Sequence, residues 1–465
     1  MTNHVPGALD QVSVDAESVS RKCMHHCSSM QQKRLSASPG LPFVILSVDR
    51  RLTNLAFMLK SRRICYLFAA TCCFSTVATA TGLPEAQPEA VQMDGTRLNL
   101  IDDVVQQGMR AGDYPGAVIL IGRHGHVVFH RAYGDRVIRP QRQPMTLDTL
   151  FDIASLTKVV VTAPAIMQLI EAGKLRLESR LGDLISACNA ADRRRITVRQ
   201  LLAHDSGLRA IFTKPLQRQV GDYDAAVRLA CVEGTYARPG VQIRYSDLNY
   251  ILLGDVVQRV SGESLDEYAY RRILHPLGMR DIYFNPPRAL KHRIAGSDVV
   301  TGQVEDGVAW RMGGVAGHSG LYSTASDLAV FSAMLLQDGE WNGTRVLSRH
   351  SVRAMTTAAV RRSHGTRGLG FDIASGYSGS RGELFPCDSF GHTGFSGVSM
   401  WLDRRSDTFV IILTNRLHPD GRGDVRNLRA QVATLAAASI QDVNFDVSAL
   451  GKLDNPAKRC RTTMP

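Results

Sequence analysis

Ser155 and Lys158 stand three residues apart in the segment 151–158, which opens an apolar helical pattern. At this spacing both side chains lie on one face of a helix. A serine hydroxyl is a weak nucleophile until a neighbouring base accepts its proton, and a lysine removed from water can be that base. In a chain of 465 residues a Ser-x-x-Lys pair also arises by chance, as a capping serine with a solvated lysine. The pair therefore predicts covalent hydrolysis only if other groups join it.

Tyr245 and Asp247 stand just before a second apolar helical pattern, at residues 251–260. A tyrosine that lies beside ammonium groups can titrate low enough to carry a proton between reacting atoms. The plainer interpretation is a half-buried tyrosine followed by a Ser or Asp that caps the helix. This segment therefore predicts a proton shuttle only if a nucleophile lies close to Tyr245.

His392, Thr393, Gly394 and Phe395 belong to a glycine-rich segment, 391–397, which separates two strand-like runs. Glycines in such a place allow a substrate backbone to lie close to a strand edge. A polar side chain there could bind a carboxylate or orient the tyrosine, whereas a plain bulge or turn is the alternative. We expect this segment to bind substrate or to support the site.

These segments need a scaffold that brings them together, and the hydrophobic pattern predicts one of the α+β class. Apolar residues at helical spacing predict a first helix near residues 98–109, and His124-Gly125 predicts a hairpin turn. Helical patterns follow at 155–172 (with Pro164 forcing a break or kink), 197–203, 248–260, 264–274, 326–336 and 424–440, and strand-like runs at 368–373, 398–403 and 408–414. Strands near both ends can form one antiparallel sheet flanked by the N- and C-terminal helices, with the helical middle as a second lobe.

In this order, the three segments resemble the serine β-lactamase and penicillin-binding-protein superfamily. The nearest resemblance is to the class C β-lactamase-related branch, which includes D-alanyl-D-alanine carboxypeptidases and esterases. Three further segments look typical of that branch, namely 201–208, 313–321 and 410–415. The resemblance covers residues 96–440 and implies a β-lactamase/transpeptidase-like fold for this serine hydrolase domain.

The resemblance implies a role for each matching residue. Ser155 would attack the substrate carbonyl. Lys158 and Tyr245 would move protons from Ser155, to the leaving group, and then from the deacylating water. The backbone N–H groups of Ser155 and Phe395 would form the oxyanion hole.

Two positions depart from the family pattern. Asp247 stands where β-lactamases have the Asn of Tyr-x-Asn, and His392 stands where they have the Lys of Lys-Thr-Gly. The resemblance implies that His392 and Thr393 contact the substrate carboxylate or Tyr245. A neutral histidine offers less positive charge to a carboxylate than a lysine does. The departures therefore favour a peptidase or esterase over efficient β-lactam hydrolysis.

The composition is that of a globular protein, with 44% hydrophobic and 21% charged residues. It excludes wholesale disorder, a collagen-like fibre and a multispan membrane protein. The net charge of +12 is a mild and scattered excess, which favours solubility and is weak evidence for nucleic-acid binding. We expect no nucleic-acid partner.

Residues 58–80 have the pattern of a secretory signal that begins at Met58, with a basic stretch, an apolar stretch and a small-residue cleavage site in that order. We predict cleavage after Ala80, with residues 1–57 as a disordered extension or a misassigned start, and 441–465 as a C-terminal tail. The general secretory and twin-arginine routes both stay open. The apolar stretch is too short and too rich in Thr and Cys for a stable membrane span. The predicted location is the periplasm, reached by secretion across the inner membrane.

Cysteines and histidines give weaker signals. Five of the nine cysteines lie in the leader, and the predicted mature chain keeps Cys188, Cys231, Cys387 and Cys460. An oxidising compartment allows one disulfide among these four, but their spacing does not reveal the pairing. His124, His126 and His130 alternate on the predicted hairpin and lack a further convincing ligand for zinc. We expect neither a metal nor a cofactor.

The sequence therefore predicts a serine hydrolase that works through an acyl-enzyme. The preferred substrate class is a cell-wall peptide that ends in a D-residue, as for a D-alanyl-D-alanine carboxypeptidase. The alternatives are a β-lactamase, an esterase acting on small acyl esters, and a non-catalytic protein that binds penicillin or wall fragments. Expected partners are a small peptide, ester or β-lactam substrate, and peptidoglycan. Ser155, Lys158 and Tyr245 together argue against a pure binder, which needs no nucleophile.

Overall fold

The computed structural model describes residues 82–362 and 365–445. The predicted signal segment, the extension before it, Cys460 and most of the predicted C-terminal tail lie outside the described residues, so the predictions made for them stay predictions. One helical stretch in the described part, Ala154–Glu171, is long and apolar enough to cross a membrane, but most of it is buried in the protein interior. It is therefore best explained as a core helix.

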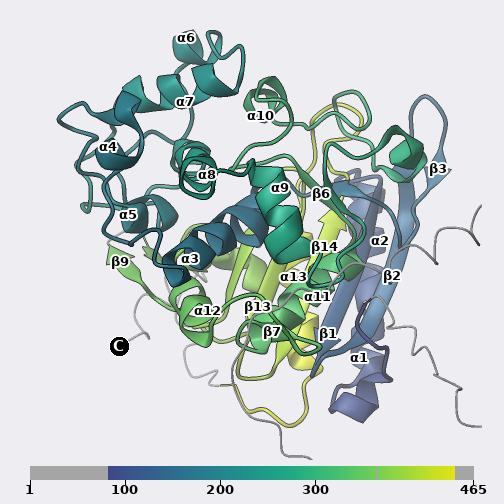
Figure 1. Cartoon of the computed structure of the whole chain (residues 1–465). Coiled ribbons are helices and arrows are strands. Elements are labelled where there is room, and N and C mark those ends of the chain that lie inside the picture. Colours follow the sequence, from purple (N-terminus) through teal and green to yellow (C-terminus); the bar gives the residue numbers. More distant parts are fainter. Residues whose placement is uncertain (1–81, 363–364, 446–465) are drawn as a thin grey trace, which may run out of the picture. The chain divides into compact units, whose positions relative to one another are not determined.

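Within the described residues, nine strands form one antiparallel sheet (Figure 1). From one edge to the other they are β3 (Gln143–Pro144), β2 (His126–Val137), β1 (Gly116–Arg123), β14 (Thr408–Thr414), β13 (Ser399–Asp403), β12 (Phe390–Thr393), β11 (Asp372–Ala374), β10 (Gly365–Arg367) and β9 (Val360–Arg362). The predicted hairpin is confirmed, since β1 and β2 pair across His124 and Gly125, whose φ angles of 50° and 72° suit a tight hairpin turn. The pairing of β1 with β14 joins the two ends of the chain.

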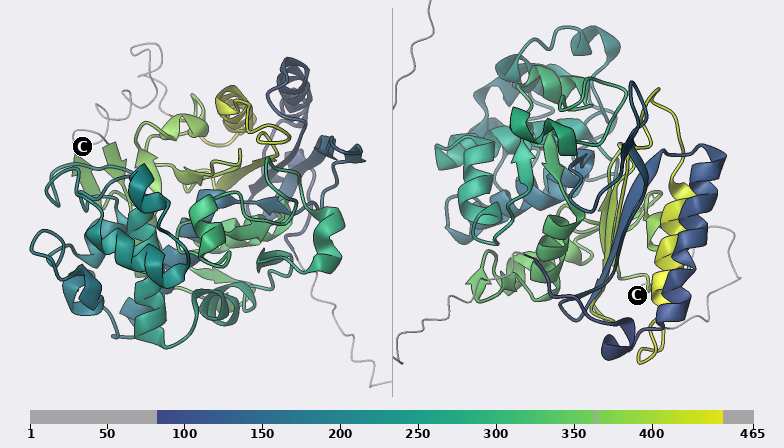
Figure 2. Two further views of the ribbon diagram at one scale, coloured as in Figure 1. Left: turned by 90° about the horizontal axis from the view of Figure 1, so that it is seen from above. Right: turned by 90° about the vertical axis from the view of Figure 1, so that its right-hand side faces the viewer.

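Two helices from opposite ends of the chain cover one face of the sheet. These are α2 (Ile101–Ala111) and α13 (Arg426–Ala438), which lie side by side in the right-hand view of Figure 2. Their apolar sides bury Val105 and Val432 against Ile119 of the sheet in one shared core cluster. This arrangement confirms the predicted α+β class, with an antiparallel sheet flanked by N- and C-terminal helices.

The middle of the chain forms a helical lobe against the other face of the sheet (Figure 2). Its centre holds α3 (Ala163–Glu171) and α8 (Asp247–Ser261), and α11 (Ala325–Leu336) packs against β1 and β14. The other helical segments of the described chain are η1 (Pro88–Val91), α1 (Gly95–Asn99), α4 (Leu181–Leu184), η4 (Ser186–Cys188), α5 (Val198–Leu202), α6 (Lys214–Gln217), α7 (Tyr223–Val232), α9 (Leu265–Ala269), η6 (Arg288–Arg293), α10 (Gly307–Arg311), α12 (Arg349–Thr356) and η7 (Ser378–Arg381). The predicted second lobe is thereby confirmed.

Two small sheets and one disulfide complete the lobe. The strands β4 (Phe151–Asp152), β6 (Leu321–Ser323) and β5 (Ile282–Phe284) form a three-stranded sheet, and β7 (Glu340–Trp341) pairs with β8 (Thr344–Arg345). A disulfide joins Cys188 in η4 to Cys231 in α7, which resolves one pairing that the sequence left open. The β4 strand ends just before Ser155 and so leads the chain into the candidate site.

The predicted helix over residues 155–172 has a more complex form. It begins as a 3-10 turn, η2 (Ala154–Leu156), continues as a π-helical segment, η3 (Lys158–Thr162), and becomes α3. Pro164 stands in the first turn of α3, where its missing N–H costs little. The irregularity is therefore the π-helical segment before Pro164 rather than a break at it.

Two other predicted elements were partly wrong. The predicted strand at 368–373 begins only at Asp372, because Gly370 has a φ of 119°, which turns the chain in a loop before β11. The predicted helix at 264–274 divides into α9 and the π-helical segment η5 (Tyr270–Leu274). In both cases the hydrophobic pattern marked a buried segment but not its backbone conformation.

Candidate active site

Ser155 lies on a short, strained turn between β4 and the core helix. Asp152 accepts a hydrogen bond from the backbone N–H of Ala154 at 2.8 Å, and the Thr157 hydroxyl donates to the Ala154 carbonyl at 2.7 Å. Ala154 has a φ of 45°, a conformation that residues other than glycine seldom adopt. These bonds hold the turn so that the partly exposed Ser155 faces the pocket.

Lys158 is fully buried beneath Ser155. Its ammonium group donates to Ser155 Oγ at 3.0 Å and to the carbonyl of His318 at 2.7 Å, and it forms an ion pair with Asp247 at 2.8 Å. Burial lowers the pKa of Lys158, and the Asp247 carboxylate opposes that shift. The carboxylate that departs from the family pattern thus favours the charged form of Lys158.

Tyr245, which stands just before α8, also reaches Ser155. Its hydroxyl donates to Ser155 Oγ at 2.7 Å, and the ring of His204 packs against its ring at a centroid distance of 4.6 Å. Burial, together with the Asp247 carboxylate, raises the pKa of Tyr245 well above its ordinary value. In the resting protein the phenol is therefore neutral and Ser155 Oγ accepts hydrogen bonds from both neighbours.

His392 lines the same pocket from β12 and is also neutral. Its Nδ1 lies 2.8 Å from the carbonyl oxygen of Thr393, which can only accept, so Nδ1 carries the proton. Nε2 is then a buried lone pair, with no partner among the described residues. Burial and the nearby Arg367 and Lys158 lower the pKa of His392 well below its ordinary value. In this form His392 offers an acceptor to the pocket, which suits a donor better than a carboxylate.

Gly394 and Phe395 continue from β12 past the turn that carries Ser155. The N–H of Gly394 donates to Val398 at 2.8 Å, and a Cβ on Gly394 would stand 2.7 Å from the backbone oxygen of Ile153. The ring of Phe395 is 62% exposed, and the guanidinium of Arg416 lies 4.7 Å from its centroid. Only a glycine allows this strand end to lie so close to the nucleophile turn.

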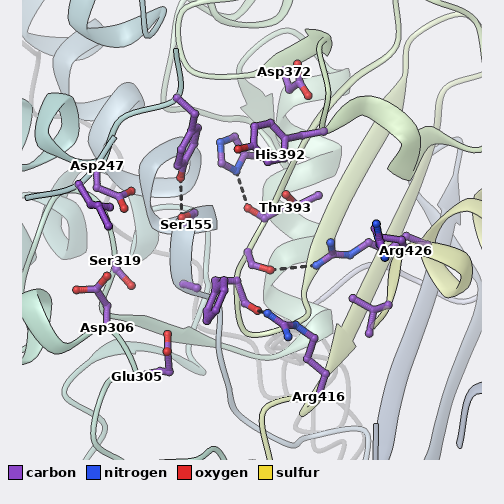
Figure 3. Close-up of a pocket in the computed structure, with 18 of the residues that line it drawn as sticks. Ser155, Asp247, Glu305, Asp306, Ser319, Asp372, His392, Thr393, Arg416 and Arg426 are labelled. Carbon is purple, nitrogen blue, oxygen red and sulfur yellow. Dashed lines mark hydrogen bonds between the residues drawn. The ribbon is translucent and has the colours of Figure 1, made fainter. Parts of the chain in front are cut away.

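The pocket has a volume of about 860 Å³, and its charged walls differ in sign (Figure 3). Glu305 and Asp306 lie on one side, and Arg416 and Arg426 on the other. Burial and the Asp152 carboxylate raise the pKa of Glu305 to about 7. Burial would also raise the pKa of Asp306, but His318 and backbone N–H groups outweigh it and hold that pKa low. The pocket therefore combines a nucleophile with room for a polar, peptide-sized substrate.

The structure brings together all eight residues that the sequence singled out, either in the pocket wall or directly beneath it. Sequence reasoning missed Arg367, which lines the pocket from β10, and Asp152, whose pKa burial raises to about 6. The ring of His204, which packs against Tyr245, was not singled out either. No sequence motif contains Arg367, since its place depends on strand pairing far from the three segments. Among the described residues, no cluster of three His, Cys, Asp or Glu side chains could hold a metal ion.

An antiparallel sheet with terminal helices, a helical lobe, and a Ser-Lys-Tyr constellation between them define a serine hydrolase of the penicillin-recognising type. The chain belongs to the β-lactamase family, whose family model matches residues 101–435.

Known relatives agree with that assignment. A putative D-alanyl-D-alanine carboxypeptidase of Escherichia coli O157:H7 is 28% identical over 398 residues, which cover 77% of this chain and 91% of that protein. The solved structure of EstCE1, a hydrolase with promiscuous acyltransferase activity, has a TM-score of 0.62 at 22% identity and covers 74% of this chain and 99% of that one. A penicillin-binding-protein homologue from Caulobacter crescentus has a TM-score of 0.60 at 22% identity, with coverage of 74% and 97%. At these identities the two structures show the shared fold.

Proposed function

We propose that the protein is a D-alanyl-D-alanine carboxypeptidase-like enzyme, in which Ser155 forms an acyl-enzyme with a peptide that ends in a D-residue. The observation that carries the proposal is that Lys158 and Tyr245 both lie within 3.0 Å of Ser155 Oγ. The name of the E. coli relative supports the substrate class.

In the proposed reaction Tyr245 accepts a proton twice and gives it up twice. In acylation, Ser155 Oγ bonds to the carbonyl carbon while its proton passes to the ionised Tyr245 oxygen. Tyr245 then gives this proton to the amine of the departing D-residue as the C–N bond breaks. In deacylation, Tyr245 takes a proton from water as the water oxygen bonds to the acyl carbon. Tyr245 then returns this proton to Ser155 Oγ as the bond between Oγ and the acyl carbon breaks. Lys158, whose charged form Asp247 favours, stabilises negative charge on Ser155 Oγ during these steps.

The oxyanion would bind between two backbone N–H groups, those of Ser155 and Phe395. Both residues line the pocket, and in the described chain neither N–H has a hydrogen-bond acceptor. The hydroxyl of Ser396 donates to the carbonyl of Asp152 at 2.7 Å, which ties the Phe395 loop to the nucleophile turn. Such preorganised donors are a large source of rate enhancement in acyl transfer.

Release of free D-alanine from a peptide that ends in D-Ala-D-Ala tests the proposal. We expect turnover by the wild type and none by Ser155→Ala, with both proteins equally folded by circular dichroism. Intact mass after mixing with benzylpenicillin separates the alternatives. A long-lived adduct supports the peptidase, whereas rapid loss of the adduct with consumption of the drug would identify a β-lactamase. No turnover of peptide, ester or penicillin would contradict a hydrolytic function.

An esterase is the second candidate, because apolar side chains rim the pocket. Ile211, Tyr377 and Phe395 all line it and are more than half exposed, at 59%, 56% and 62%. Exposed apolar side chains beside a nucleophile suit an apolar acyl group. Turnover of nitrophenyl esters without D-alanine release or a penicillin adduct would favour the esterase over the peptidase.

We further propose that the enzyme is secreted and acts in the periplasm on peptidoglycan fragments. The signal pattern at residues 58–80 supports secretion. The disulfide between Cys188 and Cys231 also supports it, because such bonds persist mainly in oxidising compartments. N-terminal sequencing of protein from a periplasmic fraction tests this: we expect a start at Thr81, and an uncleaved cytoplasmic product would contradict it.

A further inference from the structure

Arg367 is a buried cation without a carboxylate partner. It ends β10, lines the pocket and is only 2% exposed. Within the described residues the side chain of Arg367 makes one hydrogen bond, a long one of 3.5 Å from Nη1 to the carbonyl of Gly370, and its Nε has no acceptor. Buried charges in proteins are normally paired. The neighbourhood of Arg367 is therefore built to hold an anion at some stage of the reaction.

The adjacent carboxylate on the next strand forms no ion pair with Arg367 among the described residues. Asp372 is the cross-strand partner of Arg367, but one of its oxygens accepts from the Ser375 hydroxyl at 2.8 Å. Burial raises the pKa of Asp372, although Arg367 opposes that shift. The guanidinium instead lies 5.7 Å from the centroid of the Tyr245 ring. The ring of Tyr245 therefore lies close to this charge, which favours the ionised form of the phenol.

The charges around Tyr245 do not balance without Arg367 once the phenol is ionised. The groups that face it are Lys158, Asp247, Tyr250, His204, His392, Tyr377 and Arg367. The two histidines are neutral, because burial lowers the pKa of both. The Lys158 charge is matched by Asp247 at 2.8 Å. A phenolate would therefore add an unmatched negative charge if Arg367 were absent.

We propose that Arg367 is a positioning residue that acts as the counter-cation of the ionised Tyr245, and that it supplies from β10 the positive charge that His392 does not supply from β12. The inference rests on the proposed function, in which Tyr245 accepts the proton of Ser155. The Ser155 O–H bond breaks as the Oγ–carbon bond forms, and the phenolate becomes a phenol. By stabilising the phenolate, Arg367 increases the fraction of enzyme that can begin this step near neutral pH.

The test compares pH profiles of kcat/KM for the wild type, Arg367→Met, Arg367→Gln and Arg367→Lys. The substrate is a nitrophenyl ester without a carboxylate, so that substrate charge plays no part. Loss of the cation raises the pKa of Tyr245, so the limb of the profile that rises with pH should move to higher pH in the Met and Gln variants. We expect at least about a tenfold loss near neutral pH, which shrinks as the pH is raised. Arg367→Lys keeps the charge and should stay within about threefold of the wild type.

Two controls separate this role from a structural one. In a Tyr245→Phe background, Arg367→Met should add no further loss, because the group on which it acts is gone. Arg123→Met removes another fully buried arginine, at the far end of β1, and should leave the pH profile unmoved. Ultraviolet titration of the phenol, as the difference between each protein and its Tyr245→Phe form, gives a readout that is independent of turnover.

The results that would overturn the role of Arg367 differ from those that would overturn the proposed function. If the wild type is active and depends on Ser155, but neither neutral variant moves the rising limb or the Tyr245 titration, the role of Arg367 is wrong and the proposed function stands. A KM increase confined to carboxylate-bearing substrates would also overturn it, since Arg367 would then bind substrate. If Ser155→Ala retains turnover, the proposed function itself fails. If Arg367→Met and Arg367→Gln do not fold, Arg367→Lys remains as the test. This variant keeps the positive charge, so a shift of its rising limb would contradict the proposal.

Discussion

At the residue scale, the proposed mechanism gives different roles to Lys158 and Tyr245. Both donate to Ser155 Oγ, at 3.0 and 2.7 Å, but Asp247 lies beside the lysine and favours its charged form. A lysine that stays protonated stabilises negative oxygen but does not accept a proton. We therefore propose that Tyr245 carries out the proton transfers, although burial and Asp247 oppose its ionisation. Asp247 is the residue through which this chain differs most in mechanism from the family pattern.

Asp247→Asn should increase activity near neutral pH by making Tyr245 easier to ionise. Because the carboxylate raises the pKa of Tyr245, its removal lowers that pKa, and the rising limb of kcat/KM moves to lower pH. We expect a shift of about one pH unit, opposite in direction to that of Arg367→Met. Steady-state kinetics across pH measures it.

The matched control for this prediction is Asp255→Asn. Asp255 lies on the same helix, α8, is buried and pairs with Arg259 at 2.5 Å, but it does not line the pocket. Its substitution should cost stability and leave the pH profile in place. A rising limb that stays where it is in Asp247→Asn would show that the carboxylate does not act on Tyr245.

The sequence predicted the nucleophile and its two partners because each belongs to a local motif. Ser155 and Lys158 share a helix turn, and Tyr245 stands directly before α8. Arg367 belongs to no motif, and its proximity to Tyr245 arises only when β10 takes its place two strands from β12. The tautomer of His392 likewise depends on a contact with the Thr393 carbonyl that spacing does not reveal.

At the element scale, the site depends on how closely the end of β12 lies against the turn before Ser155. A Cβ on Gly394 would stand 2.5 Å from a methyl of Val398 and 2.7 Å from the carbonyl oxygen of Ile153. The backbone oxygen cannot give way as the end of a flexible side chain can. The glycine is therefore required for the contact and not for a turn.

Gly394→Ala should separate β12 from the nucleophile turn and displace the Phe395 N–H from the oxyanion position. Loss of one oxyanion donor lowers kcat by roughly 100-fold. We expect that loss with KM little changed and a modest decrease in thermal stability. Gly221→Ala is the control, since nothing lies within 4 Å of its Cβ position, and it should retain full activity. An unchanged kcat in Gly394→Ala would exclude this strand end from the oxyanion hole.

At this scale the sequence does not predict the exact backbone conformation of each segment. Apolar residues 155–172 and 264–274 predicted helices, and the hydrophobic period does not distinguish an α-helix from a π-helical segment such as η3 or η5. The strand predicted from residue 368 begins later because Gly370 has a φ of 119°. The sequence did predict that strands from both ends join one antiparallel sheet and that the terminal helices cover it, because apolar patterns reveal strands and amphipathic helices.

At the scale of the whole molecule, one covalent link lies in the helical lobe, away from the pocket. Cys188 in η4 and Cys231 in α7 are 43 residues apart in sequence, and both are buried. A disulfide across a loop of this length restricts the unfolded chain and stabilises the fold by about 2–4 kcal/mol. It supports the lobe that carries Ser155, Lys158 and Tyr245.

The double variant Cys188→Ala, Cys231→Ala should therefore lose stability and keep its activity. We expect a decrease in the unfolding free energy of about 2–4 kcal/mol, measured by urea denaturation without reductant. At a temperature where both proteins are folded, kcat/KM should match the wild type, because neither cysteine lines the pocket. A large loss of activity in a folded variant would show that the lobe transmits strain to the site.

The most direct test of the account is to locate the covalent intermediate. After brief exposure to benzylpenicillin, tandem mass spectrometry should find the intact mass of the drug on the peptide that contains Ser155, in the wild type but not in Ser155→Ala. Tyr245→Phe should form this adduct more slowly, because the proton of Ser155 then has no acceptor. An adduct on any other residue, or one that forms equally well in Ser155→Ala, would contradict the assignment of Ser155 as the nucleophile.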